Sequence, residues 1–134
     1  MAVVEEAVAL GQEMLERVQA ALAELELDGW LLYDFRGNNP VAARVLGLPA
    51  MTRRWFVLVP ATGSPIAITH RIEQQPWRSW IGENRPYLSW QELEMALRET
   101  LSGRGTIAME YSPDDGVPYI DRMPAGVLEM VRAA

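Results

Sequence analysis

The sequence predicts an α/β fold in which helices cover a mixed β-sheet. Segments with helical spacing of apolar residues alternate with short apolar runs of strand length, and two of these runs flank a Gly- and Pro-containing turn. Alternating helices and strands together with one hairpin require both parallel and antiparallel strands. We expect the order α-β-α-β-β-α-β-α in a single domain, because 134 residues fall within the roughly 100 to 200 residues of one domain.

The first helix is expected in the first 25 residues. Apolar positions recur there at alternating spacings of four and three residues, and most of the charged side chains fall between them. These positions are Val4, Val8, Gly11, Leu15, Val18, Leu22 and Leu25. Asp28-Gly29 is predicted to end the helix, and residues 30–33 form a mostly apolar run consistent with a central strand.

A turn, a short helix and a hairpin are predicted next. Asn39 can cap a helix whose first position is Pro40, so residues 41–46 should be helical and end at Gly47. Residues 54–60 and 66–70 are apolar runs on either side of an Ala-Thr-Gly-Ser-Pro turn. This arrangement indicates a β-hairpin.

The second half of the chain is predicted to add one strand, two helices and, in a tryptophan-rich stretch, a further short helix. Residues 73–81 suggest a short helix over the sheet. Ser89 and Glu92 have the spacing of a capping box and open a helix that Gly103-Arg104-Gly105 ends. A strand should follow over residues 106–110, and an apolar helix should start at Pro124 and run to the end of the chain. The aromatic residues of this half suggest a contact surface: Trp77, Trp80, Tyr87 and Trp90.

Composition excludes several classes of function. The net charge is −6 and the pI is about 4.8, so the chain lacks the basic surface that nucleic-acid binding requires. It holds no cysteine, which excludes disulfides and thiolate chemistry. No Gly-rich phosphate loop and no Gly-x-Ser-x-Gly motif is present. The first residues are acidic where a signal peptide would be basic, and we expect a cytoplasmic protein.

Two places could contribute to binding or chemistry. Arg53 and Arg54 stand at the entrance of a strand, where adjacent side chains can point to opposite faces; the simpler interpretation is a solvated pair. His70 is the only histidine and ends a predicted strand. Its imidazole could act as acid, base or hydrogen-bond donor near neutral pH, or be a structural residue.

Two stretches carry a family resemblance. They are TRRWFVLVPATGSP, followed by the strand ending at His70, and AMEYSPDDGVPYIDRMPAG. Both resemble the N-terminal domain of the creatinase/prolidase family, the pita-bread metallopeptidases that include aminopeptidase P and the Xaa-Pro dipeptidases. The resemblance covers nearly the whole chain. It implies a ribonuclease H-like version of the α/β fold, with residues 1–134 as one N-terminal domain and residues 124–134 as the start of a linker helix to a C-terminal catalytic domain.

The resemblance also implies a role without catalysis. This domain would shape the substrate cleft and the dimer interface of a metal-dependent Xaa-Pro peptidase or creatinase-like amidohydrolase. An arginine at the position of Arg53, with Arg54 as its neighbour, would hold a substrate carboxylate in the other subunit, and His70 would lie near the cleft. The implied partners are the catalytic domain, a second subunit, and a short Xaa-Pro peptide or small amide.

Metal ligands are not expected in this chain. Glu110, Asp114, Asp115 and Asp121 are clustered in sequence, but no histidine accompanies them and Asp-Asp-Gly is typical of a turn. The resemblance implies that a pair of divalent ions (Mn, Co or Zn) is held by the catalytic domain, so this chain alone should not hydrolyse a substrate.

Two alternatives remain open. The chain could be a free-standing binding or dimerisation module; an uncapped last helix, whose apolar residues run to the end of the chain, argues against that. It could also be a small enzyme in which His70 acts with Glu73 or Glu110, although no further residues support such a site.

Overall fold

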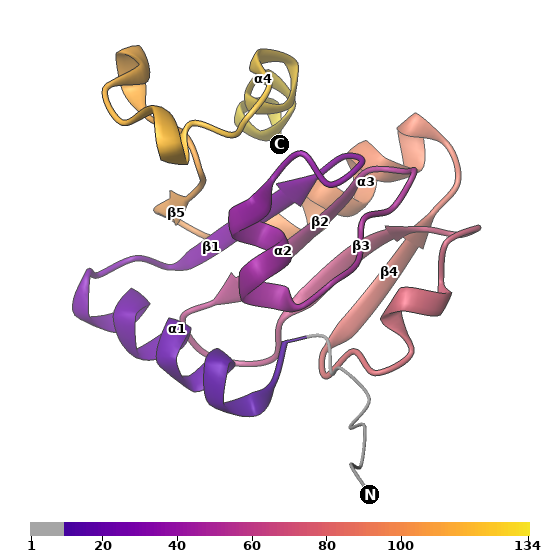
Figure 1. Ribbon diagram of the computed structural model, residues 1–134, viewed down its shortest axis with the longest axis horizontal. Coiled ribbons are helices and arrows are strands. Elements are labelled where there is room, and N and C mark those ends of the chain that lie inside the picture. Colours follow the sequence, from indigo (N-terminus) through magenta and orange to yellow (C-terminus); the bar gives the residue numbers. More distant parts are fainter. Residues whose placement is uncertain (1–9) are drawn as a thin grey trace, which may run out of the picture.

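The computed structural model describes residues 10–134 and shows a five-stranded mixed sheet with helices on both faces (Figure 1). The spatial order is β4-β3-β2-β1-β5. The strands are β1 (Gly29–Asp34), β2 (Trp55–Pro60), β3 (Ile66–His70), β4 (Glu83–Tyr87) and β5 (Ile107–Ala108). β2 pairs antiparallel with β1 and β3, whereas β3–β4 and β1–β5 are parallel. The predicted α/β class with a mixed sheet is confirmed.

A layer of helices packs on each face of the sheet, and a hydrophobic core lies between each layer and the sheet. The helices are α1 (Gln12–Glu24), α2 (Pro40–Leu46), α3 (Trp90–Leu101) and α4 (Ala125–Ala133). The core of α1 and α2 includes Val57 and Val59 of β2, while Phe56 and Leu58 belong to the core of α3 and α4. Each of these buried side chains contributes roughly 1.5–3 kcal/mol relative to exposure. No helix among residues 10–134 combines the length and apolar character that crossing a membrane requires.

The first helix differs from the prediction at its C-terminal end. Val4 and Val8 lie outside the described residues. α1 ends at its cap Leu25, and Glu26 takes a left-handed φ of 57°. Asp28 does not stop the helix: its amide donates to the Thr106 carbonyl oxygen, and its carboxylate accepts from the Thr106 amide at 2.7 Å. Asp28 therefore fixes the start of β1 beside the start of β5.

The elements from Asn39 to β3 agree closely with the prediction. The Asn39 side chain accepts from the Ala42 amide, Pro40 is the first residue of α2, and Gly47 caps the helix with φ 66°. β2 and β3 form the predicted hairpin. Local turn and cap chemistry determines these elements, which explains why the sequence was sufficient to predict them.

β4 is the strand that the sequence did not predict. Its sequence ENRPY contains no β-branched residue and includes a proline, so it lacks a strand pattern. It is an edge strand, where Pro86 is tolerated because one side of the strand needs no amide donor. Gly82 precedes it, and a Cβ on Gly82 would lie 2.0 Å from the Pro65 carbonyl oxygen. Upstream, the predicted helix at residues 73–81 is only a 3₁₀ turn, Gln75–Trp77.

The end of the chain is more irregular than predicted. β5 has two residues instead of five, and two 3₁₀ turns follow it, Pro113–Asp115 and Pro118–Ile120. Asp114 and Asp115 both have positive φ, in agreement with a turn at this position. The last helix is present, with Pro124 as its N-cap.

Candidate functional site

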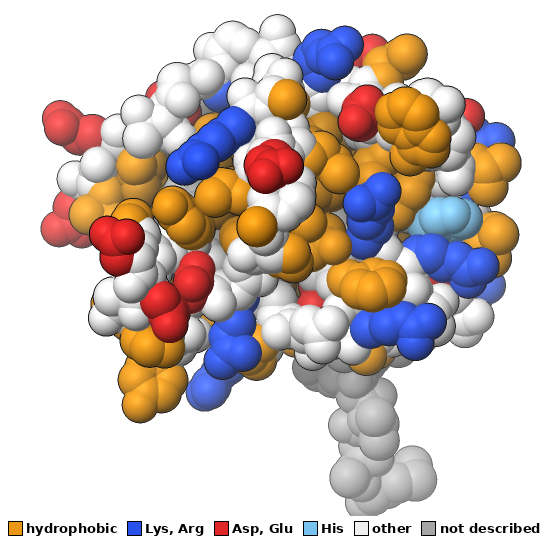
Figure 2. Space-filling model, turned by 90° about the horizontal axis from the view of Figure 1, so that it is seen from above, with side chains coloured by type: hydrophobic (Ala, Val, Ile, Leu, Met, Phe, Trp, Pro, Cys, Tyr) orange, Lys and Arg blue, Asp and Glu red, His pale blue; other side chains and the backbone are white. Residues whose placement is uncertain are grey.

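The three predicted site residues lie together at one end of the sheet. Arg53 and Arg54 immediately precede β2, and His70 ends the neighbouring strand β3. They line a hollow of about 440 Å³, here called the arginine hollow, together with Tyr33, Phe35, Tyr87, Leu88 and Trp90. Figure 2 looks onto this end of the molecule, where basic side chains surround the pale blue histidine.

Arg53 and Arg54 lie at one hollow, although adjacent positions at a strand entrance could place their side chains on opposite faces of the sheet. Both line the arginine hollow. The reason is that the strand begins only at Trp55, so the side-chain alternation of a strand does not apply to the bend that precedes it. Arg53 is exposed and Arg54 is half-buried.

Two side chains hold the backbone of the arginines. The Glu73 carboxylate accepts hydrogen bonds from the Thr52 amide at 3.0 Å and the Arg53 amide at 2.6 Å. The Tyr87 hydroxyl donates to the Arg54 carbonyl oxygen. The pKa of Glu73 is lowered: burial acts to raise it, but the two amide bonds and the charge of Arg53 outweigh burial. Glu73 therefore stays ionised and keeps the bend in place.

His70 is held as a neutral ring. Its Nδ1 accepts from the Ile72 amide at 3.1 Å, and its ring packs edge-on against Tyr87 with centroids 5.1 Å apart. Burial and the nearby charge of Arg53 lower its pKa, while Glu73 acts in the opposite direction. With Nδ1 as acceptor, Nε2 carries the proton. The positive charge of the hollow at neutral pH is therefore that of the two guanidiniums.

The rest of the arginine hollow is uncharged. Burial raises the pKa of Tyr33, and it raises the pKa of Tyr87 to about 12, so both phenols remain neutral. Phe35, Leu88 and Trp90 are 40%, 52% and 60% exposed, and no acidic side chain lines the hollow. Two guanidiniums beside an exposed apolar rim suit an anionic group attached to an apolar body.

The carboxylates that are clustered in sequence make separate contacts in the structure. Among residues 10–134 no three His, Cys, Asp or Glu side chains gather closely enough to hold an ion. Glu110 is buried and accepts from Trp30 Nε1 and Asn39 Nδ2, each at 2.7 Å. Burial raises its pKa, although both hydrogen bonds act to lower it. Asp121 accepts from the Ser112 amide.

A catalytic pair with His70 finds no geometric support among the described residues. Glu110 binds Trp30 and Asn39 and does not line the arginine hollow. Glu73 is nearby but uses its carboxylate for the two backbone amides.

Of the four aromatic residues that were expected to form a contact surface, only one is largely exposed. Trp77 and Tyr87 are each only 4% exposed and Trp80 is partly buried, while Trp90 remains exposed. Trp77 packs edge-on against Trp55 and Trp80, so it belongs to the core.

Sequence reasoning missed Tyr87 as a site residue and considered Glu73 only as a partner of His70. Tyr87 belongs to β4, and without that strand nothing places it beside the arginines. Glu73 acts on a bend 20 residues earlier, a contact for which the sequence holds no local signal.

No protein-family model and no curated protein matches the sequence. Solved structures do match. The dipeptidase PepE from Mycobacterium ulcerans shares 19% identity at a TM-score of 0.70, over 91% of this chain and 31% of that chain. The prolidase from Pyrococcus horikoshii OT3 shares 15% identity at a TM-score of 0.64, over 91% of this chain and 30% of that chain.

A third structure matches at nearly equal length. It is the creatinase/prolidase N-terminal domain of an X-Pro dipeptidase from Streptococcus pyogenes, at 12% identity and a TM-score of 0.68, over 91% of this chain and 93% of that domain. By contrast, the chain spans about a third of the length of the prolidase and of PepE. The chain therefore has the fold of the creatinase/prolidase N-terminal domain.

Proposed function

We propose that this chain is the non-catalytic N-terminal domain of a cytoplasmic, metal-dependent Xaa-Pro peptidase or creatinase-like amidohydrolase. In this role it shapes the substrate cleft and takes part in the dimer interface. The observation that carries the proposal is the arginine hollow, in which Arg53, Arg54 and a neutral His70 meet beside exposed apolar side chains. The fold shared with prolidase and dipeptidase structures supports it.

The hollow would act by binding and orienting a short peptide. The guanidiniums of Arg53 and Arg54 bind the substrate carboxylate, because a planar fork of donors matches the two carboxylate oxygens. His70 Nε2–H offers a further donor, and the apolar rim contacts the side chains of the peptide. Fixing one end of the substrate holds the scissile bond in place relative to the catalytic groups, which is a proximity effect.

The reaction itself belongs to a separate catalytic domain in this proposal. That domain would hold a pair of divalent ions (Mn, Co or Zn), which activate water and polarise the carbonyl group when bound. Residues 124–134, which include α4, would start the linker to it. Hydrolysis of a Xaa-Pro peptide then requires both domains, and a second subunit places its arginine hollow over the cleft.

The first test is the mass of the native gene product, by immunoblot and intact-mass analysis. A product two to three times larger than 15.1 kDa supports the proposal, and a product of 15.1 kDa contradicts it. In the larger protein, Arg53→Ala should lower kcat/KM for Xaa-Pro substrates with an unchanged melting temperature. The matched control is Arg44→Ala, an exposed arginine on α2 outside the hollow. Equal kinetics of the two variants would remove Arg53 from the site.

A free-standing binding or dimerisation module is the second candidate. The observation that favours it is the exposed apolar rim of the arginine hollow, because Phe35, Leu88 and Trp90 line one hollow and remain exposed in the described structure. A native mass of 15.1 kDa would support this candidate, and the rim would then be the surface on which to seek a partner.

A further inference from the structure

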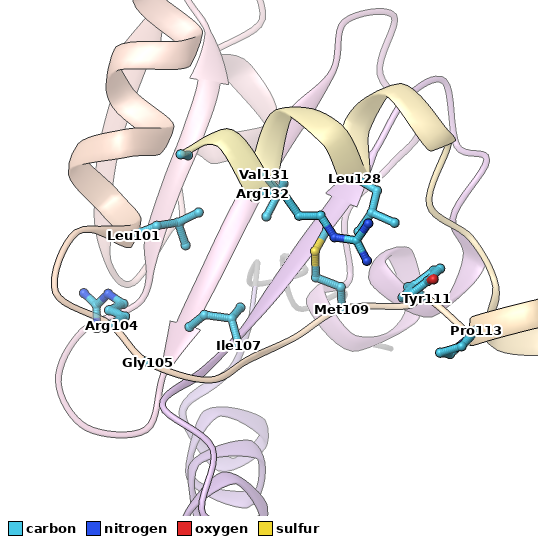
Figure 3. A pocket seen from close by; sticks show the side chains of 11 residues that line it. Leu101, Arg104, Gly105, Ile107, Met109, Tyr111, Pro113, Leu128, Val131 and Arg132 are labelled. Carbon is cyan, nitrogen blue, oxygen red and sulfur yellow. The ribbon is translucent and has the colours of Figure 1, made fainter.

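A second hollow lies between β5, the C-terminal end of α3, and α4. Its volume is about 550 Å³, and it shares no lining residue with the arginine hollow. Figure 3 shows Arg132 reaching across the hollow from α4, and Arg104 at the edge of the hollow beside the loop that follows α3. Apolar side chains of β5, of the segment that follows β5, and of α4 also line the hollow, among them Ile107, Met109 and Leu128.

Neither arginine of this hollow forms an ion pair among the described residues. The lining contains no Asp or Glu side chain, although Ala134, the last residue of the sequence, is part of it; Arg85–Glu83 is the sole ion pair among the described residues. Arg104 uses its Nε to donate to the Thr100 carbonyl oxygen at 2.8 Å; within residues 10–134 its two terminal nitrogens have no hydrogen-bond partner. The Arg132 guanidinium lies 5.8 Å from the centre of the Tyr111 ring.

The apolar side chains that line this hollow are still partly exposed to water. Ile107 and Met109 are partly buried, as are Leu128 and Val131 on the facing side of α4. A ligand with an apolar body would remove this surface from water. The volume falls within the roughly 300 to 1,000 Å³ of small-molecule sites.

We propose that this hollow binds an elongated organic dianion, in which an apolar body carries a carboxylate at each end. One carboxylate pairs with Arg104 and the other with Arg132, while the body contacts Ile107, Met109 and Leu128. Guanidinium suits both ends because it binds carboxylates through paired donors and stays charged at any working pH. The proposal does not depend on the function of the arginine hollow.

Calorimetric titration of the 134-residue chain tests the proposal. The probes are straight-chain dicarboxylates from hexanedioate to decanedioate, with the monocarboxylate and the diamine of equal length as comparisons. We expect saturable binding of one dicarboxylate per chain, about tenfold tighter than the monocarboxylate, and no binding of the diamine. Charge-assisted hydrogen bonds to a half-buried arginine such as Arg104 and an exposed one such as Arg132 have roughly this effect.

Substitutions assign the binding to the two arginines. Arg104→Met and Arg132→Met should each weaken dicarboxylate binding about tenfold and remove its advantage over the monocarboxylate, whereas Arg44→Met should bind as the unmodified chain does. Leu128→Glu keeps both arginines but places a carboxylate in the hollow, and it should abolish binding even where Arg104→Met proves unstable. Absence of dicarboxylate binding, equal binding of the diamine, or unchanged binding in both arginine variants would overturn the proposal.

Discussion

At the scale of single residues, Tyr87 connects the parts of the arginine hollow. Its hydroxyl donates to the Arg54 carbonyl oxygen, its ring packs on His70, and it is only 4% exposed. Its pKa of about 12 lies above the ordinary value of 10, chiefly because burial disfavours the phenolate. The folded protein therefore keeps a proton that the unfolded chain loses between pH 10 and pH 12.

This pKa difference predicts a pH dependence of stability. Below pH 10 both states are protonated at Tyr87 and the contribution is complete; as the pH rises toward 12, only the unfolded state ionises and the free energy of unfolding falls. Urea denaturation at several pH values should show this decline. Tyr87→Phe should cost about 1 kcal/mol at pH 7, through the lost hydrogen bond, and reduce the decline. Tyr119→Phe is the control, since Tyr119 is 82% exposed. An equal decline in Tyr87→Phe would refute the assignment.

Only the part of the arginine hollow that depends on neighbouring residues in the sequence could be predicted. Arg53, Arg54 and His70 could be selected because each stands at the end of a recognisable strand and within a family-like stretch. The backbone contacts of Glu73 and Tyr87 depend on how distant segments pack, and no pattern in the sequence encodes that packing. The sequence therefore named three of the residues that line the hollow, whose role in binding stays a prediction, and it missed the two side chains that hold the backbone of the arginines.

At the scale of elements, the helices with recognisable capping residues were predicted, whereas a strand without a local sequence signal was not. α2 and α3 have capping residues, Asn39 and Ser89, whose side chains accept from the amides of Ala42 and Glu92 as their spacing indicates. β4 has no such signal. Its position depends on parallel pairing with β3 across an irregular connection, so it is set by tertiary contacts.

Because the start of β4 lies close to the β2–β3 hairpin, we predict that a side chain at Gly82 destabilises the fold. Gly82→Ala places a Cβ 2.0 Å from the Pro65 carbonyl oxygen, so the backbone must shift, and we expect a loss of roughly 2 kcal/mol, as for overpacked sites. Gly126→Ala is the matched control: it lies in α4 with no atom within 4 Å of the new Cβ, and it should stabilise the helix by roughly 0.5–1 kcal/mol. Urea denaturation of both variants measures the difference. Equal stability of Gly82→Ala and the unmodified chain would show that β4 does not pack closely on Pro65.

At the scale of the whole molecule, we predict that the stability of the chain does not depend on metal ions. The described residues offer no cluster of three potential ligands, and the chain has one histidine and no cysteine. Exhaustive dialysis against a chelator should leave the melting temperature unchanged relative to dialysis against buffer. Added Mn²⁺, Co²⁺ or Zn²⁺ should not raise it. A chelator-induced fall of several degrees would mean that the chain holds a structural ion of its own.

The two edges of the sheet have a consequence for the protein in concentrated solution. β4 carries Pro86, which has no amide to donate, between half-buried Arg85 and buried Tyr87, and β5 at the opposite edge has only two residues. Unpaired edge strands are templates on which other molecules can add strands and grow into fibrils. Neither edge offers a long row of free donors and acceptors, so the fold is protected against edge-to-edge aggregation.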